Sequence, residues 1–312
     1  MKKIGRKLPK FMSSIGESWE IVDRQDAQSM VLNGTLKGLS LRQLIEKDPE
    51  GIVGDGHKAD QPFPLLYKII DAGDDLSLQV HPDEESCKFI EGAEPKTEMW
   101  YVIDHKKGAE ILAGIADKVS VEKFFKNLTK PSIRNLMKKF VSRKGKAFLI
   151  KATTIHSIGG GNLIYEIQQN SNTTFRVSDW GRVGSDGKPR QLHINEALTC
   201  MNHRNNRIGV IPFETLNCSY SPTSDRPCFE IKNLACSNYF KVDEFKVEGK
   251  TEFNESGAGF QTLFAVNSNL EIFCNGRKFI MKKGQTCLIP AATGTFQVNS
   301  KGKSKFIRSC AA

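Results

Sequence analysis

The sequence predicts a mainly β protein built from two β units of one type, with a small helical insertion. Three observations predict this fold class. Apolar and polar residues alternate over 76–81, as in a half-buried strand. From residue 206 onward, strand-like runs are short, closely spaced and separated by turn signals such as Asn275-Gly276, a profile typical of a β-sandwich or barrel. Residues 144–156 and 283–295 align without gaps and match at six of thirteen positions, which indicates a repeated β unit.

The first unit is expected to open with a short helix over 39–46, capped by Ser40. In the strand over 76–81, Leu76, Leu78 and Val80 would share the buried face, which leaves Ser77, Gln79 and His81 on the other. Further strands are predicted over 100–103, 147–150 and 163–169, and a second short helix over 191–201. In the strand over 163–169, Ile164, Glu166 and Gln168 share one face.

The formal net charge of +10 is concentrated in one segment. Residues 118–151 hold eleven basic residues and one acid, so the rest of the chain is neutral overall. Apolar residues in this segment recur at the spacing of an amphipathic helix: Ile133, Leu136, Met137, Phe140 and Val141. We therefore interpret the segment as a helix with a solvated basic face. Because the positive charge is confined to this one segment and the rest of the chain is neutral, we expect no nucleic-acid binding.

Composition excludes several other classes. With 39% hydrophobic and 26% charged residues, the 312-residue chain is not disordered, and no apolar run is long enough for a transmembrane helix. No apolar segment follows the basic residues near the N-terminus, so we expect no signal peptide, no membrane association and a cytoplasmic location. The eight cysteines are scattered without a Cys-x-x-Cys pair, which excludes a zinc ribbon and favours reduced, mostly buried thiols.

A candidate metal site emerges from four residues. Gln79 and His81 project from one strand in the same direction. Glu98 enters the next strand, and His156 stands at the end of the first repeat copy, where the second copy has Thr295. A set of two imidazoles, a carboxylate and an amide suits Zn²⁺ with room for water or a substrate oxygen.

Three separated motifs carry a resemblance to a known family. These are LSLQVHPD at 76–83, KTEMWYVI at 96–103 and YEIQQNSNTTFRVSDW at 165–180. In this order they resemble class I mannose-6-phosphate isomerases, most closely the short bacterial form, and the resemblance spans about residues 15–300. It implies a double cupin: two jelly-roll β-barrels. The expected domains are a catalytic cupin over 1–117 plus 144–205, the basic helical insertion over 118–143, and a degenerate cupin over 206–312.

The resemblance also implies roles for site residues. It places one zinc ion per chain on Gln79, His81, Glu98 and His156. It implies catalytic roles for Lys96, Glu166 and Arg176, and substrate phosphate contacts for Ser77 and Lys68. A departure from the family pattern precedes the expected metal histidine: the usual Pro-x-Gly is replaced by Lys151-Ala152-Thr153, and Thr takes a left-handed conformation less readily than Gly.

The expected function is therefore zinc-dependent aldose–ketose isomerisation of mannose 6-phosphate and fructose 6-phosphate through an enediol or enediolate. The expected partner is a small sugar phosphate, and the sequence does not indicate an oligomeric state. Two alternatives stay open: a non-catalytic cupin that binds or senses a sugar phosphate, and an isomerase for another phosphosugar. Of the remaining histidines, we interpret His193 as structural and assign no role to His57, His105 and His203.

Overall fold

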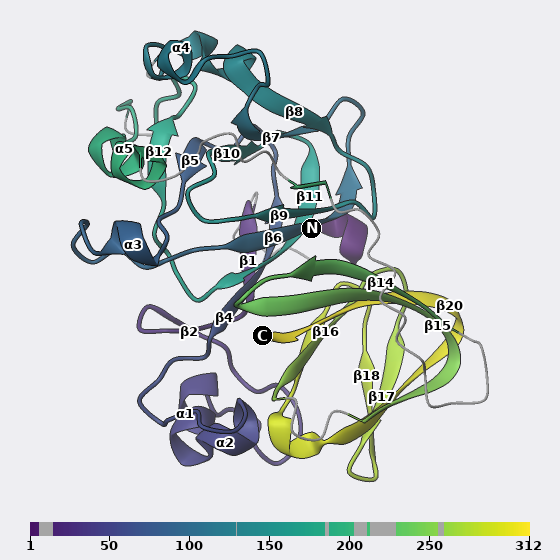
Figure 1. Cartoon of the computed structure of the whole chain (residues 1–312). Helices are drawn as coiled ribbons and strands as arrows, with labels where there is room; N and C mark the ends of the chain where they lie inside the picture. Colours follow the sequence, from purple (N-terminus) through teal and green to yellow (C-terminus); the bar gives the residue numbers. More distant parts are fainter. Residues whose placement is uncertain (6–14, 129, 185–186, 203–210, 213–228, 255–258) are drawn as a thin grey trace. The chain divides into compact units, whose positions relative to one another are not determined.

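The computed structural model describes residues 1–5, 15–128, 130–184, 187–202, 211–212, 229–254 and 259–312, and it is mainly β, as predicted (Figure 1). The chain divides into two compact units. One comprises Met1–Ile15, Trp19–Lys68 and Phe213–Ala312, and the other Gly16–Ser18 and Ile69–Pro212. Each is described by itself below. We call them the C-terminal unit and the central unit.

Two β-sheets form the central unit, and β1 and β4 run across its boundary. The order of the first sheet is β1 (Glu17–Ile21), β4 (Leu65–Asp71), β11 (Asn162–Gln169), β6 (Glu98–His105), β9 (Ala147–Ile150) and β13 (Ile211–Pro212). The order of the second sheet is β12 (Phe175–Ser178), β5 (Leu78–Val80), β10 (His156–Ile158), β7 (Glu110–Ile115) and β8 (Met137–Val141).

The two sheets share one hydrophobic core. Trp100 and Ile164 of the first sheet belong to the same buried cluster as Ile111 and Ile158 of the second. The opposite face of the second sheet, which includes Val80, packs against a separate cluster. That cluster is covered by α4 (Val121–Phe125) and α5 (Ile194–Asn202), with α5 beside β12 in Figure 1. The inner face of the second sheet, which turns toward the first sheet, can therefore carry polar side chains only at its end, beyond the shared core.

The strand prediction over 76–81 is corrected at one residue. Leu78 and Val80 pack in the outer cluster as expected, but Leu76 packs against the inner one. The reason is that β5 begins only at Leu78, so the alternation does not extend to Leu76. The short helix α3 (Glu84–Cys87) follows this strand, with Asp83 as its N-cap.

The predicted helix over 133–141 is wrong. This segment forms the 3-10 helix η2 (Pro131–Leu136) and then strand β8, which pairs with β7. Ile133 and Met137 are buried as the helical pattern required, but Val141 is 58% exposed. A 3-10 helix followed by a strand also buries Ile133 and Met137, so the helical spacing of the apolar residues did not indicate an α-helix. The basic residues here are partly paired; Lys138, for example, forms an ion pair with Asp117 at 3.1 Å.

The internal repeat is confirmed as a structural repeat. In the aligned copies, β9 matches β19 (Thr286–Ile289) residue for residue, and His156 at the start of β10 matches Thr295 at the start of β20 (Thr295–Ala311). Gly145 and Gly284 precede the paired strands with φ of 81° and 78°. In both copies, glycine therefore forms the turn that precedes the strand, because it adopts positive φ without strain.

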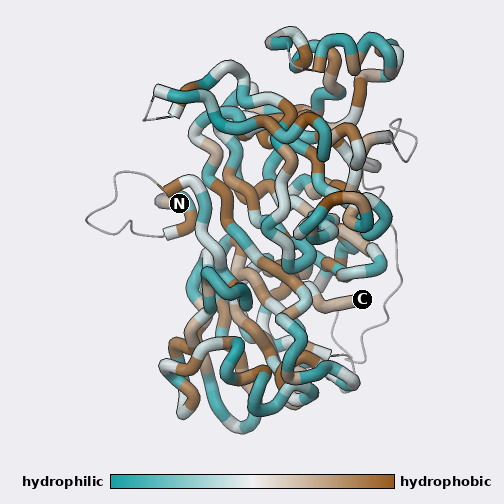
Figure 2. The backbone as a smooth tube through the Cα atoms, turned by 90° about the vertical axis from the view of Figure 1, so that its left-hand side faces the viewer, coloured by the Kyte–Doolittle hydropathy of each residue, from teal (hydrophilic) through white to brown (hydrophobic). Residues whose placement is uncertain are grey.

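The C-terminal unit contains a seven-stranded sheet. Its main path is β14 (Phe229–Cys236), β15 (Phe240–Asn254), β20, β16 (Gln261–Ala265) and β19, and β17 (Leu270–Cys274) with β18 (Arg277–Met281) lies off this path. Its core is aromatic: Phe245 stacks on Phe306 and Phe253 on Phe296, each at 5.0 Å between ring centroids. Figure 2 shows hydrophobic residues following the paths of the strands.

Short elements of residues 1–68 and 291–293 complete the C-terminal unit. They are η1 (Lys2–Ile4), β2 (Asp23–Arg24), β3 (Ala27–Gln28), α1 (Leu41–Lys47), α2 (Pro49–Ile52) and η3 (Ala291–Thr293). The predicted first helix is confirmed as α1: the Ser40 side chain accepts from Gln43 N, and the Gln43 side chain accepts from Ser40 N in return.

Residues 19–68 cluster with the C-terminal strands, whereas the sequence analysis placed them in the catalytic domain. Compactness does not reveal which residues a catalytic domain needs, so the predicted boundaries stay a prediction. Among the described cysteines none forms a disulfide, but only Cys200 is fully buried, and Cys236 is exposed. Within the described residues, no helix is long and apolar enough to cross a membrane.

Candidate active site and metal centre

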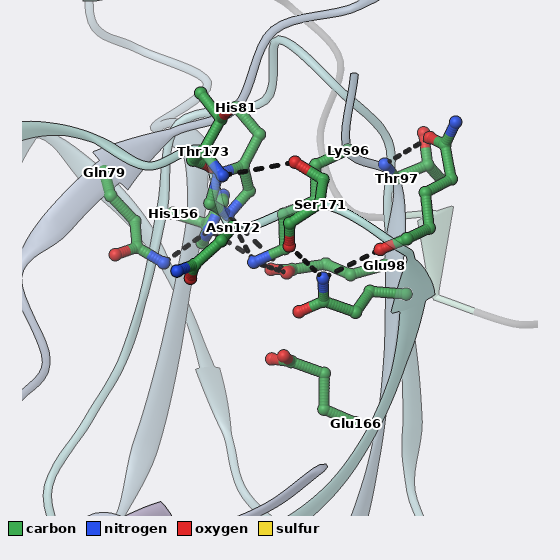
Figure 3. Close-up of polar contacts among 12 residues, drawn as sticks. Gln79, His81, Lys96, Thr97, Glu98, His156, Glu166, Ser171, Asn172 and Thr173 are labelled. Atoms are coloured by element: carbon green, nitrogen blue, oxygen red, sulfur yellow. Dashed lines mark hydrogen bonds and ion pairs between the residues drawn. The ribbon is translucent and has the colours of Figure 1, made fainter. Parts of the chain in front are cut away.

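The four predicted metal ligands converge at one end of the central unit (Figure 3). Gln79 lies on β5, His81 directly follows it, and Glu98 and His156 begin β6 and β10. His156 Nε2 lies 3.2 Å from Glu98 Oε1, and His81 Nε2 lies 3.5 Å from Glu98 Oε2. Gln79 Nε2 lies 3.2 Å from His156 Nε2. Strand pairing explains this convergence, because Gln79 and His156 are direct partners across β5 and β10.

Backbone carbonyls fix both histidine rings. His81 Nδ1 lies 2.8 Å from Thr173 O, and His156 Nδ1 lies 2.7 Å from Thr154 O. Since a carbonyl oxygen only accepts hydrogen bonds, each ring carries its proton on Nδ1 when neutral. Both Nε2 lone pairs then face the Glu98 carboxylate. This is the orientation in which carbonyl-anchored histidines bind a metal in proteins.

Glu98 completes the fit to a metal ion. Its carboxylate is buried and forms an ion pair with Lys96 Nζ at 2.8 Å. Within the described residues, however, neither carboxylate oxygen accepts a well-aligned hydrogen bond. A buried carboxylate with unused acceptor capacity beside two Nε2 lone pairs fits a divalent cation. The ligand atoms of His81, Glu98 and His156 all lie within 4.8 Å of one another.

The Gln79 amide is the ligand whose orientation can change. Ser77 Oγ donates to Gln79 Oε1 at 3.3 Å, which leaves Nε2 toward His156. A 180° turn of the amide exchanges its oxygen and nitrogen. The Ser77 hydroxyl both donates and accepts, so it can hydrogen-bond either end of the amide. Ser77 therefore lies beside the ligand set, on the face that the strand alternation predicted.

The electrostatics of the site favour metal-binding protonation states. Burial, together with the Lys96 charge, lowers the pKa of His81 to about 3, and burial also lowers the pKa of His156. Burial alone would raise the pKa of Glu98, but Lys96 and the two histidines hold it well below its usual range. Burial opposes the charge of Lys96 too, yet Glu98 and Glu166 raise its pKa overall. Neutral imidazoles and an ionised carboxylate are the forms that bind metals.

Arg176 shares the inner face with the predicted metal ligands. It is the direct partner of Gln79 across β12 and β5, so Arg176, Gln79 and His156 form a row across three strands. Its Nη1 donates to Gln191 O at 2.9 Å. Its backbone N donates to His193 Nδ1 at 3.2 Å, and its carbonyl accepts from His193 N at 2.8 Å. His193 therefore has the structural contacts expected of it: it fixes the strand that carries Arg176.

Further arginines surround Arg176, which sequence reasoning did not single out. Asp179 binds both Arg182, at 2.5 Å, and Arg190. Burial, followed by the charge of Arg190, lowers the pKa of Arg176. Three guanidinium groups around one carboxylate leave an excess of positive charge, which suits an anionic ligand. Both Arg182 and Arg190 lie near the motif that carries the family resemblance, but only the fold shows that they share Asp179.

Glu166 and Lys96 are buried on the same side. Glu166 accepts a hydrogen bond of 2.9 Å from Trp100 Nε1, its direct partner across β11 and β6. The Trp100 ring also meets the His156 ring edge-on at 5.3 Å. Lys96 Nζ lies 3.2 Å from His81 Nε2 in addition to its ion pair with Glu98. Trp100 was missed by the sequence analysis, although its position two residues after Glu98 places it on the same strand face.

Lys68 is the one predicted site residue that belongs to the C-terminal unit. It is buried on β4, and its ammonium group lies 4.8 Å from the centroid of the Trp19 ring. Its predicted phosphate contact stays a prediction. Of the histidines without an assigned role, His57 has its Nε2 3.3 Å from Gln61 O, and His105, the last residue of β6, has its Nδ1 2.9 Å from Lys106 O. His203 lies outside the described residues.

The comparisons with known proteins show the family of the chain. A family model described as the catalytic domain of type I phosphomannose isomerase matches residues 2–128, and one for the cupin domain of mannose-6-phosphate isomerase matches residues 230–311. A probable mannose-6-phosphate isomerase of Bacillus subtilis is 32% identical over 288 residues, which cover 91% of this chain and 86% of that protein. The chain belongs to the type I phosphomannose isomerase family.

Other members show the same relationship. A mannose-6-phosphate isomerase of Streptococcus mutans is 30% identical over 302 residues, covering 95% of this chain and 88% of that protein. The crystal structure of mannose 6-phosphate isomerase from Bacillus subtilis superposes with a TM-score of 0.84 at 28% identity, covering 99% of this chain and 93% of that chain. The predicted family and double-cupin fold are thus confirmed.

Thr153 occupies the left-handed turn that this family member builds without glycine. Its φ is +67°, and its N–H donates to His81 O at 2.7 Å, so the turn ties the His156 loop to the other predicted ligand histidine. A β-branched residue in this conformation costs about 1–2 kcal/mol. At ordinary positions, Gly is about 0.4–1 kcal/mol less favourable than Ala because it loses more backbone freedom on folding.

At position 153 we expect the reverse order of stability, with glycine more favourable than alanine. Thr153→Gly should be more stable than Thr153→Ala by about 1 kcal/mol, because only glycine relieves the strain. Denaturant unfolding of both variants and the wild type measures this difference. If the alanine variant proved the more stable of the two, the strain at Thr153 would be absent.

Proposed function

We propose that this chain is a zinc-dependent mannose-6-phosphate isomerase, which interconverts mannose 6-phosphate and fructose 6-phosphate through an enediol or enediolate. One observation carries the proposal. Two carbonyl-anchored histidines and the buried Glu98 aim their ligand atoms at one point, in a row with Arg176. A site for binding alone would not need a cation, a second carboxylate and a buried lysine beside the metal ligands.

We assign the metal to His81, Glu98, His156 and Gln79, with one zinc ion per chain. Two imidazole nitrogens with oxygen ligands suit zinc among the common metals. When bound, zinc supplies Lewis acidity toward a sugar oxygen without proton exchange. The chain's own residues hold three of the four ligands in place: Thr173 O and Thr154 O fix the rings, and Ser77 contacts the amide.

Isomerisation moves one proton between C1 and C2 and places negative charge on the oxygens of the intermediate. We assign Arg176 to stabilise that charge, because a guanidinium stays protonated and its backbone is fixed by His193. Proton transfer and ring opening fall to Lys96 and Glu166. The ammonium group of Lys96 can donate a proton, and the carboxylate of Glu166, held by Trp100, can accept one.

The substrate phosphate is the remaining group to place. We keep Ser77 and Lys68 as its proposed contacts, and the excess positive charge around Arg176 favours an anionic substrate. Because a sugar phosphate is charged and does not cross membranes unaided, we also propose a cytoplasmic location. The catalytic domain would comprise residues 1–117 and 144–205.

Metal analysis and an activity assay together test the proposal. Plasma mass spectrometry gives the zinc content, and a coupled assay follows fructose 6-phosphate formed from mannose 6-phosphate. Both are applied to protein as purified, after chelation and after zinc addition. We expect about one zinc per chain and turnover that chelation removes and zinc restores. Metal without turnover would favour a sensor or an isomerase for another phosphosugar, and absence of metal binding would contradict the site itself.

A further inference from the structure

Gln168 has a buried acceptor that nothing described in the chain uses. Its side chain is completely buried, and its Oε1 has no hydrogen-bond partner among the described residues. Leaving a buried amide oxygen without a partner costs about 1–3 kcal/mol, so such an atom in a folded protein calls for an explanation. The position of Gln168 in the sheet explains the unpaired oxygen better than chance packing does.

The Gln168 amide is locked in one orientation. Its Nε2 donates to Gln169 O at 2.8 Å and to Ser171 O at 2.7 Å. Both amide protons are therefore in use. Turning the amide over would place its oxygen against two carbonyl oxygens, which only accept hydrogen bonds. Oε1 is thus a fixed acceptor, because the two ends of this amide cannot exchange places.

The strand register places this acceptor in the candidate active site. Gln168 is the direct partner of Glu98 across β11 and β6, and Glu166 precedes it by two residues on the same strand. Direct partners in an antiparallel pair, and residues two apart on a strand, share a face. The acceptor therefore lies on the face that carries both the metal-ligating and the proton-transferring carboxylate. Figure 3 shows Glu98, Glu166 and Ser171 grouped there.

We propose that Gln168 Oε1 binds the sugar phosphate by accepting a hydrogen bond from one of its hydroxyl groups. A sugar hydroxyl is the donor this acceptor lacks, and the surrounding carboxylates cannot supply one when ionised. The inference rests on the proposed function, because it needs a polyhydroxyl substrate next to Glu98. It makes Gln168 a specificity-determining residue: a substrate lacking the matching hydroxyl leaves Oε1 unpaired.

The test compares wild type with Gln168→Met, a side chain of similar length without polar atoms. Ile167→Val on the opposite face of β11 is the matched packing control. The kcat and KM of each protein are measured with mannose 6-phosphate and with its 3-deoxy and 4-deoxy analogues, and zinc content is determined in parallel. Gln168→Met should lower kcat/KM for mannose 6-phosphate by roughly 10–100-fold with full zinc content. Ile167→Val should remain close to wild type.

The analogues decide the assignment. Wild type should discriminate against one deoxy analogue by at least about tenfold, and Gln168→Met should lose most of that discrimination. Equal discrimination by the two proteins would overturn the proposal. Loss of zinc from Gln168→Met would overturn it too, since Gln168 would then support Glu98 rather than contact substrate. Inactive wild-type protein would remove the proposed function and this inference with it, whereas active wild type with an unaffected variant would remove this inference alone.

Discussion

Replacing His156 by alanine is expected to release the metal and to reduce turnover by at least roughly a thousandfold. Its Nε2 is one of the two proposed imidazole ligands, and its ring is completely buried beside Glu98 and the Trp100 ring. Thr154, which holds the His156 ring, contributes only its backbone carbonyl to that contact and does not replace the lost Nε2. Loss of Lewis-acid stabilisation amounts to several kcal/mol, and each 1.4 kcal/mol corresponds to about tenfold in rate.

Two further variants keep this prediction specific. His156→Gln fills most of the space of the imidazole, so it separates loss of the ligand from collapse of a cavity. His105→Ala, on the surface of the same unit, should keep both zinc and turnover, since its ring contacts only Lys106 O. Zinc content and kcat/KM are measured for all three. His156→Ala protein with a full complement of zinc and normal turnover would show that the metal lies elsewhere.

The sequence predicted that the candidate ligands lie together, and the local part of that prediction came from strand alternation. Gln79 and His81 lie two residues apart on a strand, and their shared direction needs no knowledge of the fold. The prediction that Gln79 and His81 lie beside His156 is not local. It depends on β5 pairing with β10 across 77 residues, and a shift of one residue would turn Gln79 to the other face. The family resemblance supplied that information, since the spacing alone does not contain it.

Elsewhere, local sequence patterns predicted the wrong structure or gave no prediction. The helical spacing over 133–141 was met by η2 and β8, because burial of Ile133 and Met137 is compatible with either structure. Trp100 and Gln168 showed no sign of a role, since an aromatic or an amide in a strand is ordinary. Their importance comes from the partner that the register gives each one, Glu166 and Glu98. Such pairings are properties of the sheet rather than of either strand.

Replacing Arg176 by alanine is expected to keep the metal and to lower kcat by roughly 100–1000-fold, the range seen when one group that stabilises an oxyanion is removed. Arg176 shares its strand face with Gln79, but a protonated guanidinium has no acceptor and cannot serve as a metal ligand. Arg176→Lys should recover only part of the loss, because an ammonium lacks the planar fork of donors. Arg143→Ala, an exposed arginine of the same unit, is the charge-matched control and should stay close to wild type.

The division of the loss between kcat and KM identifies what Arg176 does. A group that acts only on the charge developing in the reaction lowers kcat and kcat/KM together, whereas one that binds the phosphate equally throughout raises KM. Arg182 and Arg190, held by Asp179, already offer positive charge for a ground-state anion. Arg176 is instead fixed in the row of metal ligands by His193, so its guanidinium should be needed most when charge appears beside the metal. A rise in KM with unchanged kcat would assign Arg176 to phosphate binding and remove its proposed role in the chemical step.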